Sequence, residues 1–407
     1  MSDESNIPPP LAAVPPQLPP EPVVSPPSVP DWLVTLLSLC LGLFLADAVL
    51  SFADDSLRLF NITFLGGFRV LIGLFGALIA LIVYILMAFV PTIPKKYFVP
   101  LALFNLFASM AGILPTIYFY DRTQRIAWVI SLCQVFLGAW LLYALRGEFT
   151  VHWPLVKSSR LRFRRFSWSN FWAFVLANIF ILVPGVLLYF FLCASLAIGH
   201  FSEGFMALHM GGLSVQSRTY VRDDKTIRLF PMSHVADADF YQQISGAFPS
   251  NSVVLMEGVT DDQNLITNKI SYERMAKSLG LAEQHKQFKP DKGKWVDADV
   301  DVSIFSKDTL TILNLVMMIH SQGINPGNLQ TLMQFSPSPQ IQQELIDDLL
   351  HKRNHHLLDQ VQVWLPKSDY LMIPWGAAHM PELSHEIQKS GFHLVSSQDY
   401  QVIRFRF

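Results

Sequence analysis

Long apolar stretches separated by short polar breaks run through the first half of the chain, from Asp31 to about Phe201. A helix that crosses a bilayer needs about 20 mostly apolar residues. Five stretches meet this requirement, so the pattern predicts a bundle of about five transmembrane helices. They are Trp32–Phe52, Phe68–Val90, Phe98–Tyr118, Ile126–Leu145 and Phe171–His200.

The pattern of the second half is different, because polar and apolar residues mix there as they do in a soluble domain. Three parts are therefore expected: a proline-rich tail at 1–30, a transmembrane helical region at 31–210 and a soluble α/β domain at 211–407. The tail has no Lys or Arg and no apolar run, so it is not a secretory signal. Its composition is typical of a disordered or polyproline-type segment.

Basic residues predict the orientation of the membrane region. The densest cluster of Lys and Arg lies in the connection that spans Arg146–Arg165. Short loops rich in Lys and Arg face the cytoplasm, so we expect this loop and the N-terminal tail to be cytoplasmic. The C-terminal domain is then extracytoplasmic. The stretch Phe171–His200 contains Pro184-Gly185 and is expected to be one kinked span; two half-spans would invert the orientation.

Composition narrows the classes of function. Hydrophobic residues make up 51% of the 407 residues and charged residues 15%, with a net charge of −2. Nucleic-acid binding would need a basic face, so no nucleic-acid partner is expected. All three cysteines lie in apolar stretches, which excludes a Cys-ligated zinc site in the soluble half. Asp47 is the one deep acid that the spans contain, which argues against a transporter.

A βαβ unit is predicted at the start of the soluble domain. Thr226–Val235 and Ser252–Glu257 are apolar runs typical of buried strands, and Asp237–Phe248 between them has helical spacing. A crossover of this kind makes its two strands parallel. We therefore expect His234 and Glu257 at the C-terminal ends of neighbouring parallel strands. Open α/β sheets bind their ligands at that edge.

The end of the chain repeats the pattern. Asp369–Trp375 is predicted as a strand, Gly376–His379 as a tight turn and Pro381–Ser390 as a helix. His379 is thereby expected at the same edge as His234. Two histidines and a glutamate can ligate a divalent metal, or act as base and orienting groups in hydrolysis. Hydrogen-bonded structural roles are the alternative for each of them.

Two further features belong to the candidate site. Asp297, Asp299 and Asp301 alternate along an extended segment, either as a cation-binding face or as the solvent face of an edge strand. Arg353 and Asn354 continue the apolar stripe of a helix predicted from Ile341 to about Leu365, and a buried arginine needs an anionic partner. One of the aspartates is the structural partner we expect, and a substrate anion is the alternative.

These residues, in this order, resemble the TraB/Tiki/GumN superfamily, to which the erythromycin-esterase-like and ChaN-like proteins are more distantly related. The resemblance covers about 212–407. Gly376–His379 fits the family's second Gly-x-x-His motif, whereas Pro231-Met-Ser-His234 lacks the glycine of the first. Members include metal-dependent proteases and a pheromone-shutdown protein.

The resemblance implies roles for five residues. His234 and His379 would bind a divalent ion (Mn²⁺, Co²⁺ or Zn²⁺), and Glu257 would be a third ligand or the base. Arg353 and Asn354 would stabilise and orient the tetrahedral intermediate.

The expected function is that of a membrane-anchored hydrolase, a metal-dependent peptidase acting on an extracytoplasmic peptide or protein. A non-enzymatic module that sequesters a peptide signal or a cofactor such as haem is the alternative. Expected partners are the lipid bilayer and a peptide or protein substrate; a homo-oligomer is left open.

Overall fold

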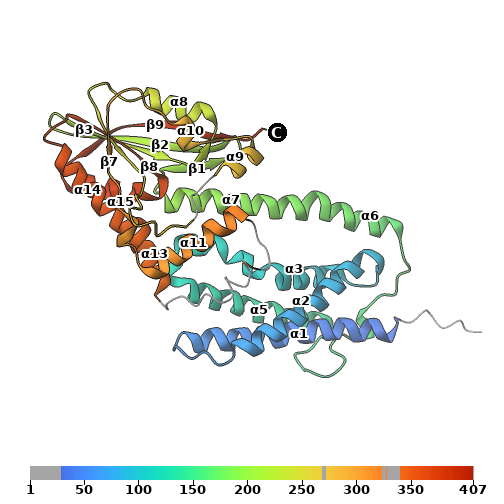
Figure 1. Ribbon diagram of the computed structural model, residues 1–407. Coiled ribbons are helices and arrows are strands. Elements are labelled where there is room, and N and C mark those ends of the chain that lie inside the picture. Colours follow the sequence, from blue (N-terminus) through green and yellow to red (C-terminus); the bar gives the residue numbers. More distant parts are fainter. Residues whose placement is uncertain (1–28, 268–271, 323–326, 328–339, 407) are drawn as a thin grey trace, which may run out of the picture. The chain divides into compact units, whose positions relative to one another are not determined.

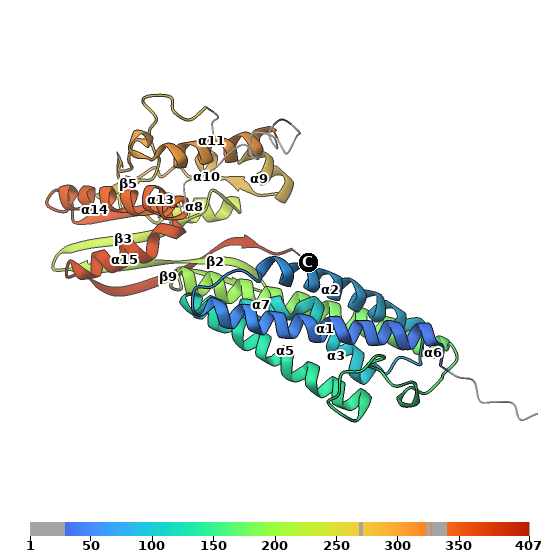
Figure 2. The same ribbon diagram turned by 90° about the horizontal axis from the view of Figure 1, so that it is seen from below.

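A computed structural model describes residues 29–267, 272–322, 327 and 340–406, so residues 1–28 of the predicted tail lie outside it. The chain divides into two compact units, residues 1–184 and 185–407. The first is helical, and the second carries a β-sheet with helices against it (Figures 1 and 2).

Five candidate membrane spans are present in the described chain, at Asp31–Arg58, Gly66–Phe89, Lys95–Tyr118, Tyr120–Arg146 and Trp168–Phe201. This confirms the predicted bundle and indicates a multi-pass membrane protein. The helices are α1 (Asp31–Arg58), α2 (Gly66–Phe89), α3 (Lys95–Ala111), α4 (Ile113–Tyr118), α5 (Thr123–Arg146), α6 (Trp168–Ala177) and α7 (Val183–Phe201).

The last span stays helical through its proline. A π-helical turn, Asn178–Leu182, joins α6 to α7 directly before Pro184. Proline removes a helical hydrogen bond and clashes with the preceding turn, and a π turn is one way to absorb that mismatch. The side chain of Asn178 donates to the carbonyl of Phe174 at 2.8 Å, and the hydroxyl of Tyr84 donates to Asn178 at 2.7 Å. The helix therefore continues without a break where two half-spans were the alternative.

Two buried acids at the end of α1 were not foreseen. Helix α1 extends past the predicted end at Phe52, and this brings Asp54 and Asp55 into the bundle. Arg58, one turn further on, lies 2.9 Å from Asp54, and Arg69 of α2 lies 2.6 Å from Asp55. The predicted end of the first span at Phe52 was therefore too early, and arginines from two helices neutralise the two additional carboxylates. Asp47 as the deep acid of the spans stays a prediction.

The strands of the second unit are β1 (Met206–His209), β2 (Gly212–Arg222), β3 (Lys225–Met232), β4 (Val235–Ala236), β5 (Val253–Met256), β6 (Ala282–Glu283), β7 (Lys294–Asp297), β8 (Tyr370–Gly376) and β9 (His393–Arg404). Its further helices are α8 (Ala238–Gly246), α9 (Glu273–Leu279), α10 (Gln284–Gln287), α11 (Lys307–Gln322), α13 (Ile341–Ile346), α14 (Lys352–Trp364) and α15 (Met380–Lys389). A π turn at Asp347–His351 joins α13 to α14, which makes the helix predicted from Ile341 continuous.

The sheet is mixed, with the order β1-β2-β3-β8-β5-β7 and with β9 beside β2. Strands β3, β8, β5 and β7 are parallel, whereas β1, β3 and β9 pair with β2 in the antiparallel sense. This confirms the predicted soluble α/β domain with a partly parallel sheet.

Strands β3 and β5 are parallel, as predicted, but they are not neighbours. Strand β8 lies between them, pairing Leu229 of β3 with Ile373 and Val254 of β5 with Met372. The reason is burial: β8 is buried from Leu371 to Trp375, and a strand buried on both faces belongs in the middle of a sheet.

Alternation along β8 assigns its residues to two cores. Leu371, Ile373 and Trp375 belong to the core formed with α14 and α15, whereas Met372 faces the core formed with α8. Helices therefore cover both faces of the parallel part of the sheet. The residues at the end of β8 and directly after it contact both neighbours: Gly376 bonds Glu257, which follows β5, and His379 bonds Asn354 of α14. These contacts set the geometry of the site.

Candidate active site

The C-terminal ends of three adjacent parallel strands converge on one arginine. Glu257 follows β5, Asp299 follows β7 and His379 follows β8, while Arg353 reaches them from α14. The side chain of Arg353 is largely enclosed, with 14% of it exposed, and its guanidinium lies 5.4 Å from the ring centre of Trp375. A charge this far from solvent requires anionic partners.

Asp299 is the principal partner of that arginine. Its carboxylate accepts two parallel hydrogen bonds from Arg353, from Nε at 3.0 Å and from Nη2 at 2.6 Å, and its side chain is fully buried. Backbone N–H groups of Gly258 and Val300 donate to the same carboxylate at 3.0 and 2.9 Å. Burial is the largest single effect and opposes the charge on Arg353, but the hydrogen bonds and charges of Asp299 and Glu257 together outweigh it and raise the pKa of the guanidinium. The expected pairing of Arg353 with one of the aspartates is confirmed.

Glu257 links the arginine to the turn after β8. One oxygen, Oε1, accepts from Nη2 of Arg353 at 2.8 Å, and the other, Oε2, accepts from the backbone N–H of Gly376 at 2.5 Å. An added Cβ at Gly376 would lie 3.4 Å from Glu257, which is ordinary van der Waals contact, so the backbone N–H rather than the missing side chain is what this position contributes. Two carboxylates, Glu257 and Asp299, thus face one guanidinium, which leaves the site with a surplus negative charge.

His379 is buried beside this ion network. Its Nε2 lies 3.3 Å from Nη1 of Arg353 and 3.7 Å from Oε1 of Glu257. The indole of Trp375 meets the imidazole edge to face, with ring centres 5.2 Å apart. Burial lowers the pKa of His379 to about 4; Glu257 opposes this shift and Arg353 adds to it. The imidazole is therefore neutral at physiological pH.

Two consecutive hydrogen bonds, through Asn354 to Glu382, fix the tautomer of His379. Asn354 donates from Nδ2 to Glu382 at 2.6 Å, which leaves its Oδ1 to accept from Nδ1 of His379 at 2.7 Å. Nδ1 therefore carries the proton, and the lone pair of Nε2 points toward Arg353 and Glu257. Glu382 also contacts Nδ1 of His351 at 2.9 Å. The sequence did not single out Glu382, and the one local signal was its position in the first turn of α15, where acids are common.

His234 lies apart from the other predicted residues in its described contacts. Its exposed ring stacks on Tyr272 with ring centres 4.8 Å apart, and its carbonyl accepts from the N–H of Gln284 at 2.9 Å. The phenol of Tyr272 lies within the electrostatic reach of Glu257: burial, and then the charge of Glu257, raise its pKa. His234 thus reaches the rim of the site through Tyr272. Its role as a metal ligand stays a prediction.

The three alternating aspartates take separate roles. Asp299 holds Arg353, Asp301 accepts from the hydroxyl of Thr260 and the N–H of Asp262, and Asp297 is exposed at the end of edge strand β7. Hydrogen bonds from Ser303 and Asp262 are the main reason why the pKa of Asp301 is well below its usual range.

The arrangement of His379, Glu257 and Arg353 bears on the divalent ion expected at this site. The 3.7 Å between Nε2 of His379 and Oε1 of Glu257 is compatible with two ligands that each bind one ion at about 2 Å. However, Arg353 lies within 3.3 Å of both atoms, in the position that a cation would take. Among the described residues, no group of three His, Cys, Asp or Glu side chains is arranged to hold a metal. As it stands, the site does not fit the expected three-ligand ion.

Comparison with protein-family models, curated proteins and solved structures finds no match for this chain.

Proposed function

We propose that this protein is a membrane-anchored hydrolase that cleaves a peptide or protein, with His379 as its general base. The observation that carries the proposal is the orientation of His379: Asn354 and Glu382 hold Nδ1–H, so the lone pair of Nε2 is directed at Arg353 and Glu257. The resemblance to the TraB/Tiki/GumN superfamily adds support, since the same residues occupy its motifs.

In the proposed reaction, Nε2 of His379 accepts a proton from a water molecule as the water oxygen forms a bond to the substrate carbonyl carbon. The carbonyl oxygen becomes an oxyanion, whose charge Arg353 stabilises. The C–N bond then breaks, and the proton on Nε2 passes to the departing amine. Glu257 offsets the positive charge that His379 carries between these two steps; the two side chains are 3.7 Å apart.

A divalent ion stays a prediction within this proposal. It is an alternative to the histidine base, because Nε2 of His379 cannot hold an ion and accept a proton at once. His379 and Glu257 would hold the ion, which would supply activation of the water and polarisation of the carbonyl when bound. Arg353 would first have to move away from both side chains, because its guanidinium contacts the same atoms. The surplus negative charge of the site favours such an exchange of one cation for another.

A binding module for a peptide signal or a cofactor such as haem is the second candidate. The observation in its favour is that the surplus carboxylate can hold a cationic group, such as a peptide amino terminus, without any bond being broken. We further propose that the soluble unit is extracytoplasmic, on the basis of the basic loop Arg146–Arg165.

Peptide hydrolysis by the purified full-length protein separates the two candidates. We expect His379→Ala to lower turnover by about 10²–10⁴-fold, as the loss of an acid–base group does. His385→Ala is the matched control, because His385 lies on the same helix, is exposed and contacts Glu203 at 2.8 Å. Tight binding of a peptide without cleavage, with Mn²⁺, Co²⁺ or Zn²⁺ supplied, would favour the binding module. Equal activity of the two variants would contradict the role of His379 as the general base, and no cleavage by the wild type would contradict the hydrolase.

A further inference from the structure

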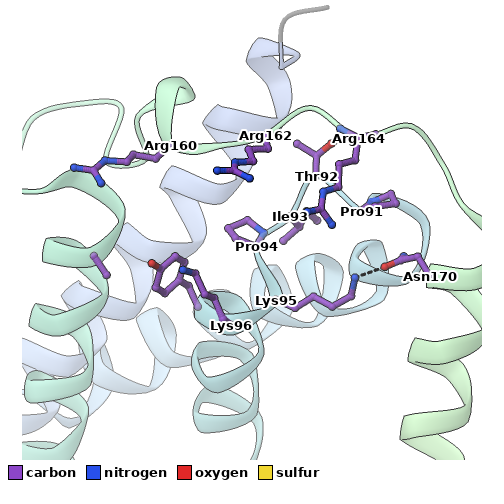
Figure 3. A pocket seen from close by; sticks show the side chains of 12 residues that line it. Pro91, Thr92, Ile93, Pro94, Lys95, Lys96, Arg160, Arg162, Arg164 and Asn170 are labelled. Carbon is purple, nitrogen blue, oxygen red and sulfur yellow. Dashed lines mark hydrogen bonds between the residues drawn. The ribbon is translucent and has the colours of Figure 1, made fainter.

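A basic hollow lies at one end of the helical unit. Its volume is about 610 Å³, within the roughly 300–1,000 Å³ of small-ligand sites. The turn before α3 and the segment at 158–165 form its walls (Figure 3). All of its lining residues lie within residues 91–170 and therefore within the first unit.

Five cationic side chains line the hollow, and no Asp or Glu does. The cations are Lys95, Lys96, Arg160, Arg162 and Arg164. Within the described part of the chain, none of the five forms an ion pair. The nearby acid in the sequence, Glu148, is already engaged by Arg146 at 3.2 Å and by Lys157 at 2.9 Å. The positive charges therefore repel one another unless an anion enters.

The alternating direction of side chains in an extended segment places arginines on the same side of the connection. Side chains two residues apart in an extended segment point to the same face, which applies to Arg162 and Arg164. Arg160 ends a short 3-10 helix, Ser158–Arg160, directly before them. Leu161, between Arg160 and Arg162, is buried in the core of the bundle. In Figure 3 the three arginines follow one another along this connection and stand opposite Lys95 and Lys96 at the start of α3.

The wall is anchored at several points. Leu155 and Val156 are buried against the helices, and the N–H of Val156 donates to the hydroxyl of Ser38 at 3.0 Å. The hydroxyl of Thr92 bonds both the N–H and the carbonyl of Arg164, at 3.0 and 3.1 Å. Lys95 donates to Asn170, which ties α3 to α6. The backbone that carries the arginines is thus held in place before any ligand binds, which lowers the entropy cost of binding.

The hollow lies at the level of a membrane interface. Candidate spans begin beside it at Lys95 and Trp168 and end at Arg146. Large exposed aromatic side chains, Phe166 and Trp168, flank the segment, as expected where a helix enters the headgroup layer. Basic pockets between helix ends at this depth suit lipid headgroups.

We propose that this hollow binds a phosphate-bearing anion, with the headgroup of an anionic phospholipid as its ligand. Planar guanidinium groups of Arg162 and Arg164 match the oxygen geometry of a phosphate, and Lys96 adds a third positive charge. A soluble phosphorylated compound presents the same chemistry, so the experiment has one arm for each source.

Thermal unfolding of the delipidated full-length protein in an uncharged detergent tests the proposal. We expect phosphatidylglycerol to raise Tm by several degrees and phosphatidylcholine to have little effect, because ligand binding stabilises the folded state. Arg162→Gln and Arg164→Gln should each weaken the apparent affinity about tenfold, the effect of losing one charge-assisted hydrogen bond. Within the residues that the structure describes, neither arginine side chain has a hydrogen-bond partner that its replacement would leave unpaired.

Arg165→Gln is the matched control, since Arg165 lies in the same segment and carries the same charge but does not line the hollow. It should retain the wild-type response. Stabilisation by inorganic phosphate that Arg162→Gln abolishes, without a lipid effect, would support the phosphate site and assign it to a soluble ligand. Equal stabilisation of the wild type and the Arg162→Gln/Arg164→Gln variant, or no response of the wild type to either ligand, would overturn the proposal.

Discussion

Arg353 and Asp299, which are 54 residues apart in the chain, form a bidentate ion pair at the C-terminal edge of the sheet, with N–O distances of 3.0 and 2.6 Å. The pair joins α14 to the end of β7 and holds the guanidinium within reach of Glu257 and His379. The position of the cation in the site is therefore set by a carboxylate that is itself inaccessible to solvent.

Asp299→Asn is expected to destabilise the soluble unit. The substitution removes the fully buried, bidentate partner of Arg353 and leaves the guanidinium with Glu257, at a cost of about 3 kcal/mol. For a unit of this size that corresponds to a fall in Tm of roughly 6–12 °C. Thermal unfolding of the full-length protein measures it. Asp297→Asn is the control, because Asp297 is exposed and its replacement should change Tm little. Equal melting temperatures for both variants would mean that the ion pair is not important for stability.

Asn354→Leu is expected to impair the positioning of His379 more than the binding of substrate. Asn354 is fully buried and bridges His379 to Glu382, so the substitution frees the imidazole to change its tautomer and orientation. We expect kcat for peptide hydrolysis to fall about 10–100-fold, as for other groups that orient a functional histidine, with a smaller change in KM. His355→Ala, at the adjacent exposed position, should behave like the wild type. A change in KM alone would argue against a positioning role.

The burial of His379 predicts a pH-dependent stability. Its pKa is lowered to about 4 in the folded protein, against about 6.5 for an exposed histidine. The unfolded chain therefore binds a proton more readily than the native state. The stabilisation is fully present above pH 6.5 and is lost as the pH falls toward 4, and it amounts to about 3 kcal/mol. Melting curves between pH 7.5 and 4.5 should fall more steeply for the wild type than for His379→Gln. Parallel curves would show that His379 is not buried in its neutral form.

Reporter fusions test the predicted topology. A reporter inserted in the basic loop Arg146–Arg165 should give a cytoplasmic signal, and one at Phe407 an extracytoplasmic signal, because a single span separates the two positions. A cytoplasmic signal at both would contradict the proposed location of the soluble unit.

Much of the candidate site was predictable from local sequence, for identifiable reasons. A turn of small residues, Gly376–His379, follows an apolar run, so the exit of His379 from a strand end was expected. Arg353 interrupts the apolar stripe of a helix, and so its need for a carboxylate was expected too. Glu382 was missed because an acid in a first helical turn has an ordinary local explanation, and nothing nearby in sequence indicates Asn354 as its partner.

The sequence by itself determined the features that depend on short-range periodicity. Bilayer thickness and the helical rise require about 20 apolar residues, and the pleat requires an alternation of two; both can be read directly along the chain. Only the tertiary structure decided that β8 lies between β3 and β5, since any apolar strand can pair with another and total burial determines which one is central. That choice brings Glu257, from the middle of the chain, against Gly376 and His379 near its end. The same dependence on long-range packing left His234 at the rim, stacked on Tyr272.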